Sequence, residues 1–244
     1  MTLGAHTEVH GHLEDPLNLF PWALSKLHTL WLRATYPFAS MGRGVSTHYT
    51  FLVNRTTARR IKLGDWVILG KDAWLNIIPE ATEDVNIIID DNCHLGPRTW
   101  ISAKNQIHLE RDVHVGPSVL IQDHSHFYEC TDLPIKKQKA TDGGRIRIER
   151  GCSISGGAAI MCDRGELVLG EHCVVAPNAV VVRSAPPYSV IAGNPARVIE
   201  RLDPPQAGRL SPSCSNGDGR LQGKSVEAHP QGQIRTESSR EAGP

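Results

Sequence analysis

Two histidines in the segment Gln122-Asp123-His124-Ser125-His126 are the side chains best suited to chemistry in this chain. An imidazole with its ordinary pKa of about 6.5 is largely neutral at cytoplasmic pH, so it can take a proton from a hydroxyl as a general base. Asp123 can hydrogen-bond one imidazole and hold its tautomer. It can equally cap the local backbone, which is a common habit of Asp in loops. The sequence leaves both roles of Asp123 open.

The chain has 12 histidines, and the others are less promising. His94 and His114 each lie five places after an inward aliphatic position of the repeat described below, so we expect them to face solvent from regular coils. His108 and His172 occupy similar outward positions. The candidates for a catalytic base are therefore His124 and His126.

A six-residue repeat from about Ile61 to Ile191 must position these side chains. Its aliphatic positions include Leu63, Leu69, Leu75, Ile89, Leu95, Ile101, Leu109, Val115, Ile121, Ile148, Ile154, Ile160, Leu169, Val175 and Val181. Four places after an aliphatic comes a small or β-branched residue, such as Cys93, Cys152 or Cys173. This period is typical of a parallel β-helix, in which each coil stacks on the one before. The sequence thus predicts an all-β solenoid over residues 61–200.

The longest break in the repeat separates Ile121 from Ile148. Pro134 and the pair Gly143-Gly144 argue against regular strand pairing within it. We therefore predict a loop over residues 122–147 that leaves the coil. Long loops on a rigid scaffold often carry function, so the two histidines at its beginning mark the expected site.

Residues 1–60 are predicted to be an N-terminal extension with a helix at about 17–40. Phe20, Leu24, Leu27 and Trp31 have helical spacing and would form one apolar face. That helix would either cover the open end of the solenoid or lie on a membrane surface as a peripheral contact. Residues 201–244 are rich in Gly, Ser, Pro and charge, and we predict a disordered C-terminal tail.

The composition of the chain limits which binding partners and which cellular compartment we expect. The formal net charge is +0, which argues against nucleic acid as the main partner. The 6 cysteines form no C-x-x-C pair, so reduced thiols in a cytoplasmic protein are expected. No basic stretch followed by an apolar run is visible at the N-terminus, so no secretory signal is predicted.

Three features together resemble the hexapeptide-repeat acyltransferases: the repeat, the long loop after D-H-x-H, and the segment Ala192-Gly193-Asn194-Pro195-Ala196-Arg197. The resemblance covers about 61–200 and points to the sugar and polysaccharide O-acetyltransferase branch, similar to the maltose, galactoside and colanic acid acetyltransferases. It implies a left-handed parallel β-helix and a homotrimer with active sites between subunits. It also implies acetyl-coenzyme A as co-substrate, with no metal.

The resemblance also implies roles for individual residues. His124 matches the family's general base, whereas His126 would support it, orient the acceptor or be the base itself. Gly156 matches the segment whose backbone amide approaches the thioester, although the family more often has Gly where this chain has Ser155. The alternative is that Gly156 and Gly157 only turn the coil.

By the same correspondence, six residues are expected to bind coenzyme A. Ala176 and Asn194 would line the pantetheine groove, with Gly156 and Gly157 beside them. Arg183 and Arg197 would contact the phosphates, because a guanidinium matches phosphate well. A solvated surface arginine is the alternative for each of the two.

The expected function is therefore acetyl transfer to a hydroxyl of a sugar or glycan precursor. A metalloenzyme similar to the γ-carbonic anhydrases is an alternative, but its zinc site needs three histidines. After His126 the chain offers only His172 and His229. A non-catalytic binding or scaffold solenoid is the remaining alternative.

Overall fold

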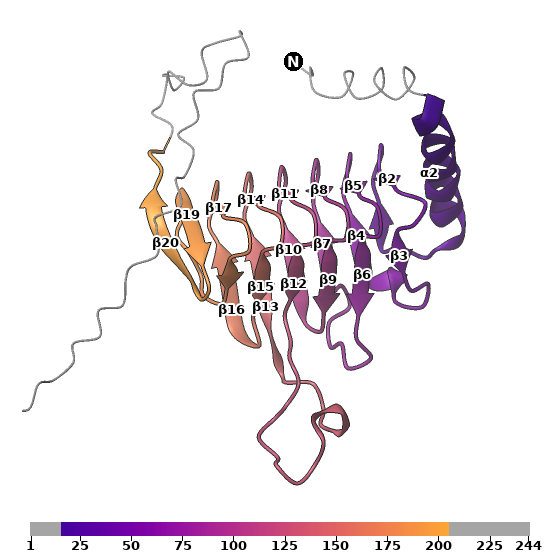
Figure 1. Cartoon of the computed structure of the whole chain (residues 1–244). Helices are drawn as coiled ribbons and strands as arrows, with labels where there is room; N and C mark the ends of the chain where they lie inside the picture. Colours follow the sequence, from indigo (N-terminus) through magenta and orange to yellow (C-terminus); the bar gives the residue numbers. More distant parts are fainter. Residues whose placement is uncertain (1–15, 205–244) are drawn as a thin grey trace, which may run out of the picture. The chain divides into compact units, whose positions relative to one another are not determined.

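The computed structural model describes residues 16–204, which form a stack of β-coils with one helix at the N-terminal end (Figure 1). The predicted parallel β-helix is confirmed: strands far apart in sequence pair side by side in three sheets. Residues 1–15 of the predicted N-terminal extension and nearly all of the predicted disordered tail lie outside the described residues.

The three sheets, called A, B and C, are the three faces of the solenoid. Sheet A contains β1 (Ser40–Met41), β4 (Ile61–Leu63), β7 (Ile87–Ile89), β10 (Gln106–Leu109), β13 (Gly143–Ile148) and β16 (Arg164–Leu169). Sheet B contains β2 (Ser46–Thr47), β5 (Ile68–Leu69), β8 (His94–Leu95), β11 (His114–Val115), β14 (Ser153–Ile154), β17 (Val174–Val175), β19 (Ser189–Gly193) and β20 (Ala196–Arg201). Sheet C contains β3 (Leu52–Val53), β6 (Trp74–Ile77), β9 (Trp100–Ala103), β12 (Leu120–Gln122), β15 (Ala159–Met161) and β18 (Val180–Val181). Neighbouring strands are parallel except β19 and β20, which form an antiparallel hairpin.

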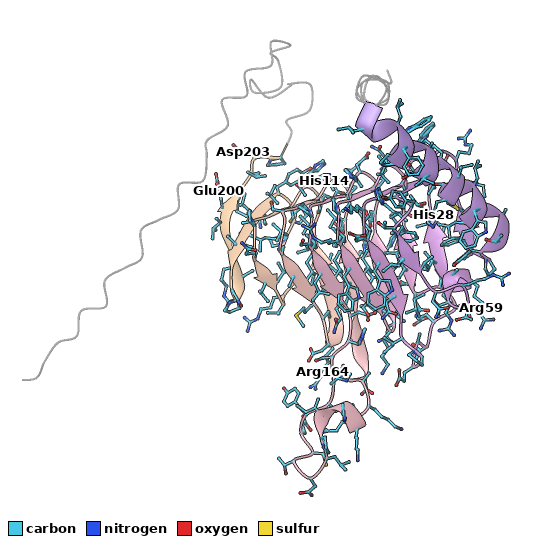
Figure 2. The ribbon with its side chains drawn as sticks, turned by 45° about the vertical axis from the view of Figure 1, so that its right-hand side comes forward. His28, Arg59, His114, Arg164, Glu200 and Asp203 are labelled. Atoms are coloured by element: carbon cyan, nitrogen blue, oxygen red, sulfur yellow. The ribbon has the colours of Figure 1, made fainter. Side chains whose placement is uncertain are left out.

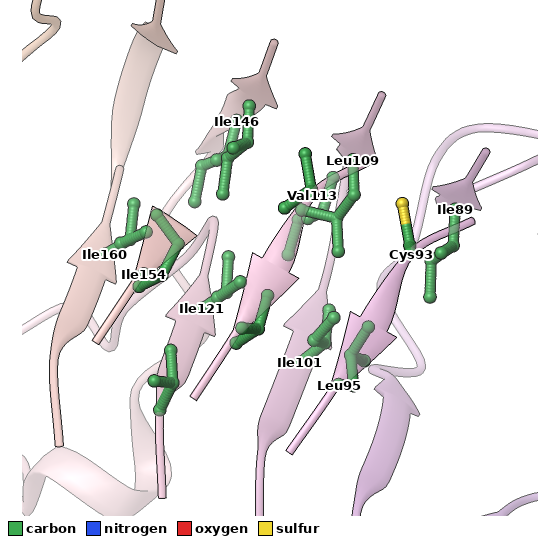
Figure 3. Packing of buried hydrophobic residues seen from close by; sticks show 14 of the residues in the cluster. Ile89, Cys93, Leu95, Ile101, Leu109, Val113, Ile121, Ile146, Ile154 and Ile160 are labelled. Carbon is green, nitrogen blue, oxygen red and sulfur yellow. The ribbon is translucent and has the colours of Figure 1, made fainter. Parts of the chain in front are cut away.

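The repeat residues fill the interior, as Figure 3 shows for the central coils. Leu69 pairs with Leu95 and Leu75 with Ile101, so equivalent aliphatics stack from coil to coil and are fully buried. Cys93 occupies the small-residue position of its coil, and burial raises the pKa of its thiol to about 12. This thiol therefore stays protonated and packs as a small hydrophobe.

The turns between sheets form three edges of different character, which we name AB, BC and CA. The AB and BC edges consist of short uniform turns, and each of these turns except the BC turn of the first coil has one residue at positive φ. On the BC edge these residues are Asp72, Arg98, Ser118, Gly157 and Asn178. The CA edge instead takes the insertions, including 78–86 and the long loop. The breaks in the repeat therefore gather on one edge of the solenoid.

The solenoid begins before the predicted boundary at residue 61. Strands β1, β2 and β3 already form a first coil, with Ser40 paired to Lys62 and Leu52 paired to Trp74. Its interior positions are filled by residues such as Thr47 and Phe51, which lie outside the aliphatic pattern of the repeat. The first coil is therefore complete in the structure, although its residues do not show the six-residue repeat.

The pair Gly143-Gly144 does not interrupt pairing, contrary to the sequence-based expectation. Both residues lie in β13 and pair with Arg164 and Gly165 of β16, so the loop proper spans 123–142. A Cβ on Gly144 would collide with the Sγ of Cys162 and come within 3.0 Å of that residue's carbonyl oxygen. Glycine here permits a close approach of backbones rather than breaking a strand.

Helix α2 (Pro16–Thr35) ends earlier than the predicted residue 40, because Pro37 disfavours helical backbone before it and β1 follows. It covers the first coil beside β2, with Leu32 in the core and the Thr29 hydroxyl 3.0 Å from that of Thr47. In the described residues no helix has the length and apolar character needed to cross a membrane.

The helix covers the coil with a different face from the predicted one. The contact side carries Ser25, His28 and Thr29, and His28 Nδ1 lies 3.1 Å from the Thr47 hydroxyl. Phe20 and Trp31, which belong to the predicted apolar face, are exposed. Hydrogen bonds with β2 and the buried Leu32 decide which side of the helix faces the solenoid.

Candidate active site

The long loop leaves sheet C after Gln122 and projects from the CA edge (Figure 1). Its two arms run antiparallel near the base: Thr141 N–H donates to Ser125 O at 2.8 Å, and Phe127 N–H to Lys139 O at 3.0 Å. The base of the loop is therefore a short ribbon that fixes where each residue of the D-H-x-H segment lies.

The preceding coil anchors this ribbon through Lys104 and Asn105. The buried Lys104 ammonium donates to the carbonyl of Thr141. The Asn105 side-chain amide donates to Asp142 O at 3.0 Å and to Gly144 O at 3.2 Å. Sequence reasoning missed both residues, since their meeting with the loop follows from coil stacking and no motif marks it.

Asp123 is completely buried, and its carboxylate makes three contacts. Oδ1 accepts the backbone N–H of Lys104 at 2.7 Å, and Oδ2 accepts that of Asn105 at 2.9 Å. Oδ1 also lies 3.1 Å from Nδ1 of His124. The geometry therefore contains both interactions that the sequence left open for Asp123, the backbone cap and the contact with a histidine.

His124 is 8 % exposed and held on two sides. The Gln122 side chain donates to its backbone carbonyl at 2.6 Å, and Asp123 faces Nδ1. Because a carboxylate only accepts hydrogen bonds, this contact places the proton of a neutral ring on Nδ1. Nε2 is then unprotonated, which is the state that a general base requires.

His126 is placed differently, although it is only two residues further on. Its backbone forms an isolated bridge with Ala140 in the loop ribbon, and its side chain is exposed. No hydrogen bond to its ring is formed within residues 16–204. The geometry therefore favours His124 over His126 as an oriented base.

Gly156 lies on the BC edge, at the first residue of the turn after β14. In the same register, the neighbouring coils have Pro97, Pro117 and Pro177, which carry no backbone N–H. The Gly156 N–H donates to no other group of the described chain. At this position of the BC edge the Gly156 coil thus has a free backbone N–H, whereas the two adjacent coils have none. Such a donor is suited to stabilising an oxyanion.

Gly157 has a simpler explanation than Gly156. Its φ is +73°, and the equivalent Ser118 and Asn178 in neighbouring coils also have positive φ. Every coil after the first has this backbone conformation at the second residue of its BC turn, and glycine adopts it most easily. The turn geometry accounts for Gly157 without a ligand.

The residues expected to bind coenzyme A fall in three places. Ala176 lies on the BC edge, one coil beyond Gly156. Asn194 is in the turn of the β19–β20 hairpin, and Arg197 is on β20 with Nη1 donating to Ala196 O at 2.8 Å. Arg183 follows β18 on the CA edge. Both guanidinium groups are exposed and form no ion pair in the described residues.

The two halves of the candidate site lie on opposite edges of sheet C. Asp123 and His124 follow β12 on the CA edge, whereas Gly156 precedes β15 on the BC edge. The label of Arg164 in Figure 2 marks the CA edge, at the base of the loop. One chain therefore holds His124 and Gly156 apart by the width of a sheet.

Two open clefts among residues 16–204 lie near the first coils, away from both halves. One, of about 280 Å³, lies between α2 and sheet B and is lined by Trp22, His48 and Lys71. The other, of about 370 Å³, is lined by Pro37, Arg55, Thr56 and Arg59. Across the same residues, no three His, Cys, Asp or Glu side chains are grouped so as to hold a metal ion.

Comparison with known proteins identifies relatives of the same fold, while no family model matches the chain. A probable acetyltransferase of Mycobacterium tuberculosis is 28% identical over 168 residues, covering 66% of this chain and 49% of the relative. The chain thus spans about half the length of the curated relative it matches.

Solved structures of AntD, an N-acyltransferase from Bacillus cereus, are similar at 14% and 15% identity. The first, in complex with dTDP and coenzyme A, has a TM-score of 0.59 and aligns over 72% of this chain and 89% of that one. The second, with dTDP and 3-hydroxybutyryl-CoA, has a TM-score of 0.58 over 72% and 88%. These likenesses establish the fold. Together with the repeat and the curated relative, they support the resemblance to the hexapeptide-repeat acyltransferases, without deciding the branch.

Proposed function

We propose that this hexapeptide-repeat protein, built on the fold of the acyltransferases described above, transfers an acetyl group from acetyl-coenzyme A to a hydroxyl of a sugar or glycan precursor. The observation that carries the proposal is the buried Asp123–His124 pair, which leaves Nε2 of His124 ready to accept a proton. The curated relative supports acetyl transfer, and the bound dTDP of the AntD complexes supports a sugar nucleotide as acceptor.

In this reaction His124 takes the proton of the acceptor hydroxyl while its oxygen attacks the thioester carbonyl. The Gly156 N–H stabilises the oxyanion of the tetrahedral intermediate. The intermediate collapses with cleavage of the carbon–sulfur bond, and the proton on His124 passes to the departing thiolate. A base of this kind contributes about 10²–10⁴-fold in rate.

The site is completed between copies of the chain, and we propose a homotrimer. A cyclic arrangement that turns sheet C of each copy toward the symmetry axis brings the CA edge of one copy to the BC edge of the next. His124 of one copy then faces Gly156, Ala176 and Asn194 of its neighbour.

The outer surface of sheet C suits such an interface. One outward residue of each strand is apolar, and these residues stand in register along the whole solenoid: Leu52, Trp74, Trp100, Leu120, Ala159 and Val180. Trp74 and Trp100 stack with ring centroids 4.7 Å apart, and Trp100 is 43% exposed in the single chain. A continuous apolar column of this kind is typical of a surface that another chain covers.

An amine of an amino sugar is the second candidate acceptor, because AntD is an N-acyltransferase. The test is release of coenzyme A by purified protein with matched pairs of dTDP-sugars that carry either a hydroxyl or an amine at one position. O-acetyl transfer predicts turnover with the hydroxyl sugar and an ester product that hydroxylamine cleaves. If only an amide product forms, the acceptor group is an amine and not a hydroxyl.

The remaining alternatives give different results in the same preparation. Binding of acetyl-coenzyme A without turnover on any carbohydrate would contradict the enzyme proposal, and no binding at all would favour a scaffold protein. Stoichiometric zinc in active protein, lost together with activity on chelation, would favour the metalloenzyme alternative.

A further inference from the structure

Helix α2 carries an apolar surface that the solenoid does not cover. Phe20, Leu27, Leu30 and Trp31, called the apolar stripe below, are 72%, 64%, 63% and 52% exposed. Their spacing places them on one side of the helix. A contiguous group of large apolar side chains on a surface usually marks an interaction site, whereas scattered single ones do not.

The stripe is separate from the contact that holds the helix in place. The opposite side provides Ser25, Thr29 and Leu32, with Thr29 bonded to Thr47 and Leu32 buried at 1% exposure. Sliding or rotating the helix to bury the stripe would break these contacts. The stripe is therefore available to a partner while the helix stays docked.

The charge around the stripe is positive. Helix α2 contains Lys26 and Arg33 and no acidic residue, although Glu14 and Asp15 precede it in the sequence. The cleft lined by Arg55 and Arg59 lies just beyond its C-terminal end, where Arg55 Nε donates to the carbonyl of Thr35 at 2.9 Å. Figure 2 shows Arg59 on the first coil beside this end of the helix.

We infer that the α2 end of the solenoid docks on an anionic lipid surface, with the apolar stripe in the headgroup region and Arg55 and Arg59 facing lipid phosphates. An exposed stripe of Leu, Phe and Trp next to cations, without acids on the helix, matches the chemistry of helices that lie in a membrane interface. A lipid surface fits better than a second protein copy, because a second α2 would bring its own cations against these. This inference is independent of the acceptor proposed above.

The test is co-sedimentation of the full chain with vesicles. Wild-type protein is expected to bind vesicles of phosphatidylcholine mixed with phosphatidylglycerol and to bind pure phosphatidylcholine much more weakly. The double variant Leu27→Ser/Leu30→Ser should lower binding to the anionic vesicles by about tenfold or more, because two anchors are removed. Arg55→Gln/Arg59→Gln should remove most of the preference for anionic lipid.

The matched control is Ile199→Ser on β20, whose side chain is 55% exposed on the last strand of the solenoid, far along the stack from α2. It should bind vesicles like the wild type. Equal binding by the Leu27→Ser/Leu30→Ser variant, or no binding by the wild type, would overturn the inference. A fall in oligomeric mass for that variant in sedimentation velocity would assign the stripe to a second copy instead.

Discussion

Asp123 determines much of what His124 can do. A carboxylate removed from water is stable only when other groups replace its hydration. Two backbone N–H groups of the preceding coil do this, and the remaining contact is with His124 Nδ1. The same residue therefore ties the loop to the coil and assigns the tautomer of the imidazole, so the ring that we propose as the base is oriented before any substrate binds.

The first prediction concerns the two histidines. His124→Ala is expected to lower kcat by about 10²-fold or more, because the proton acceptor is lost. Acetyl-coenzyme A should still bind, since its proposed ligands are on the BC edge, and calorimetry can measure this directly. His126→Ala serves as the control and should change kcat by less than His124→Ala. The reverse order of effects would transfer the role of base to His126.

The second prediction concerns the backbone of Gly156. Gly156→Pro removes the N–H at a register position where three other coils already have proline, so folding should survive. Loss of one oxyanion donor is expected to lower kcat by about 10²–10³-fold. Gly156→Ala keeps the N–H and is the matched control for the added Cβ, which would lie 3.2 Å from Pro117 O. Equal losses in both variants would point to a steric effect and remove the oxyanion role.

Residue types and motif position alone predict the segment 122–126 and the edge glycines, but they do not separate the members of each pair. His124 and His126 look alike in the sequence, and only burial and the contact with Asp123 distinguish them. Gly156 and Gly157 likewise differ only in backbone conformation and in the residue types at the equivalent positions of the neighbouring coils. Such differences arise from stacking, which a single sequence does not display.

At the scale of the elements, the insertions share one edge for a structural reason. The AB and BC turns stack closely from coil to coil: for example, Gly157 N–H donates to Pro117 O of the coil before, and Asn178 N–H to Gly156 O. An insertion there would break this ladder, whereas the CA edge tolerates loops of different length. The longest loop can therefore grow from the CA edge without disturbing the core.

The third prediction concerns the pairing of β13 with β16. Gly144→Ala forces a Cβ against Cys162 and is expected to cost about 1–3 kcal/mol of unfolding free energy, as overpacking usually does. Thermal or denaturant unfolding measures the loss. Adding Cys162→Ala should restore part of it by removing the Sγ that collides. Unchanged stability in Gly144→Ala would mean that the strands do not approach as closely as described.

The repeat predicted the regular coils, since an aliphatic residue every six positions has no other simple interpretation. It did not reveal the first coil, in which Thr47 and Phe51 fill interior positions. It also misjudged Gly143-Gly144, because a glycine that breaks pairing and one that permits close pairing look the same. The contact side of α2 was likewise not predicted, since it is marked by hydrogen bonds to Thr47 and one buried Leu32 rather than by an apolar face.

At the scale of the whole molecule, the solenoid places the two groups of candidate site residues far apart within one chain. The candidate base His124 is on one edge of sheet C, and the candidate amide donor Gly156 is on the other. The interior enclosed by the three sheets is packed with Ile, Leu and Val (Figure 3). A packed core of this kind does not deform to bring its edges together. Association of identical copies is the simplest way to build a complete site from one such chain.

The most direct measurement is complementation between two inactive variants, His124→Ala and Gly156→Pro, co-expressed so that mixed oligomers form. If each site takes its base from one copy and its amide donor from the next, random mixing restores about a quarter of the wild-type sites. Each variant expressed alone should stay inactive, with the same oligomeric mass as the wild type. We expect activity to recover to about that level, and no recovery in verified mixed oligomers would contradict a site shared between copies.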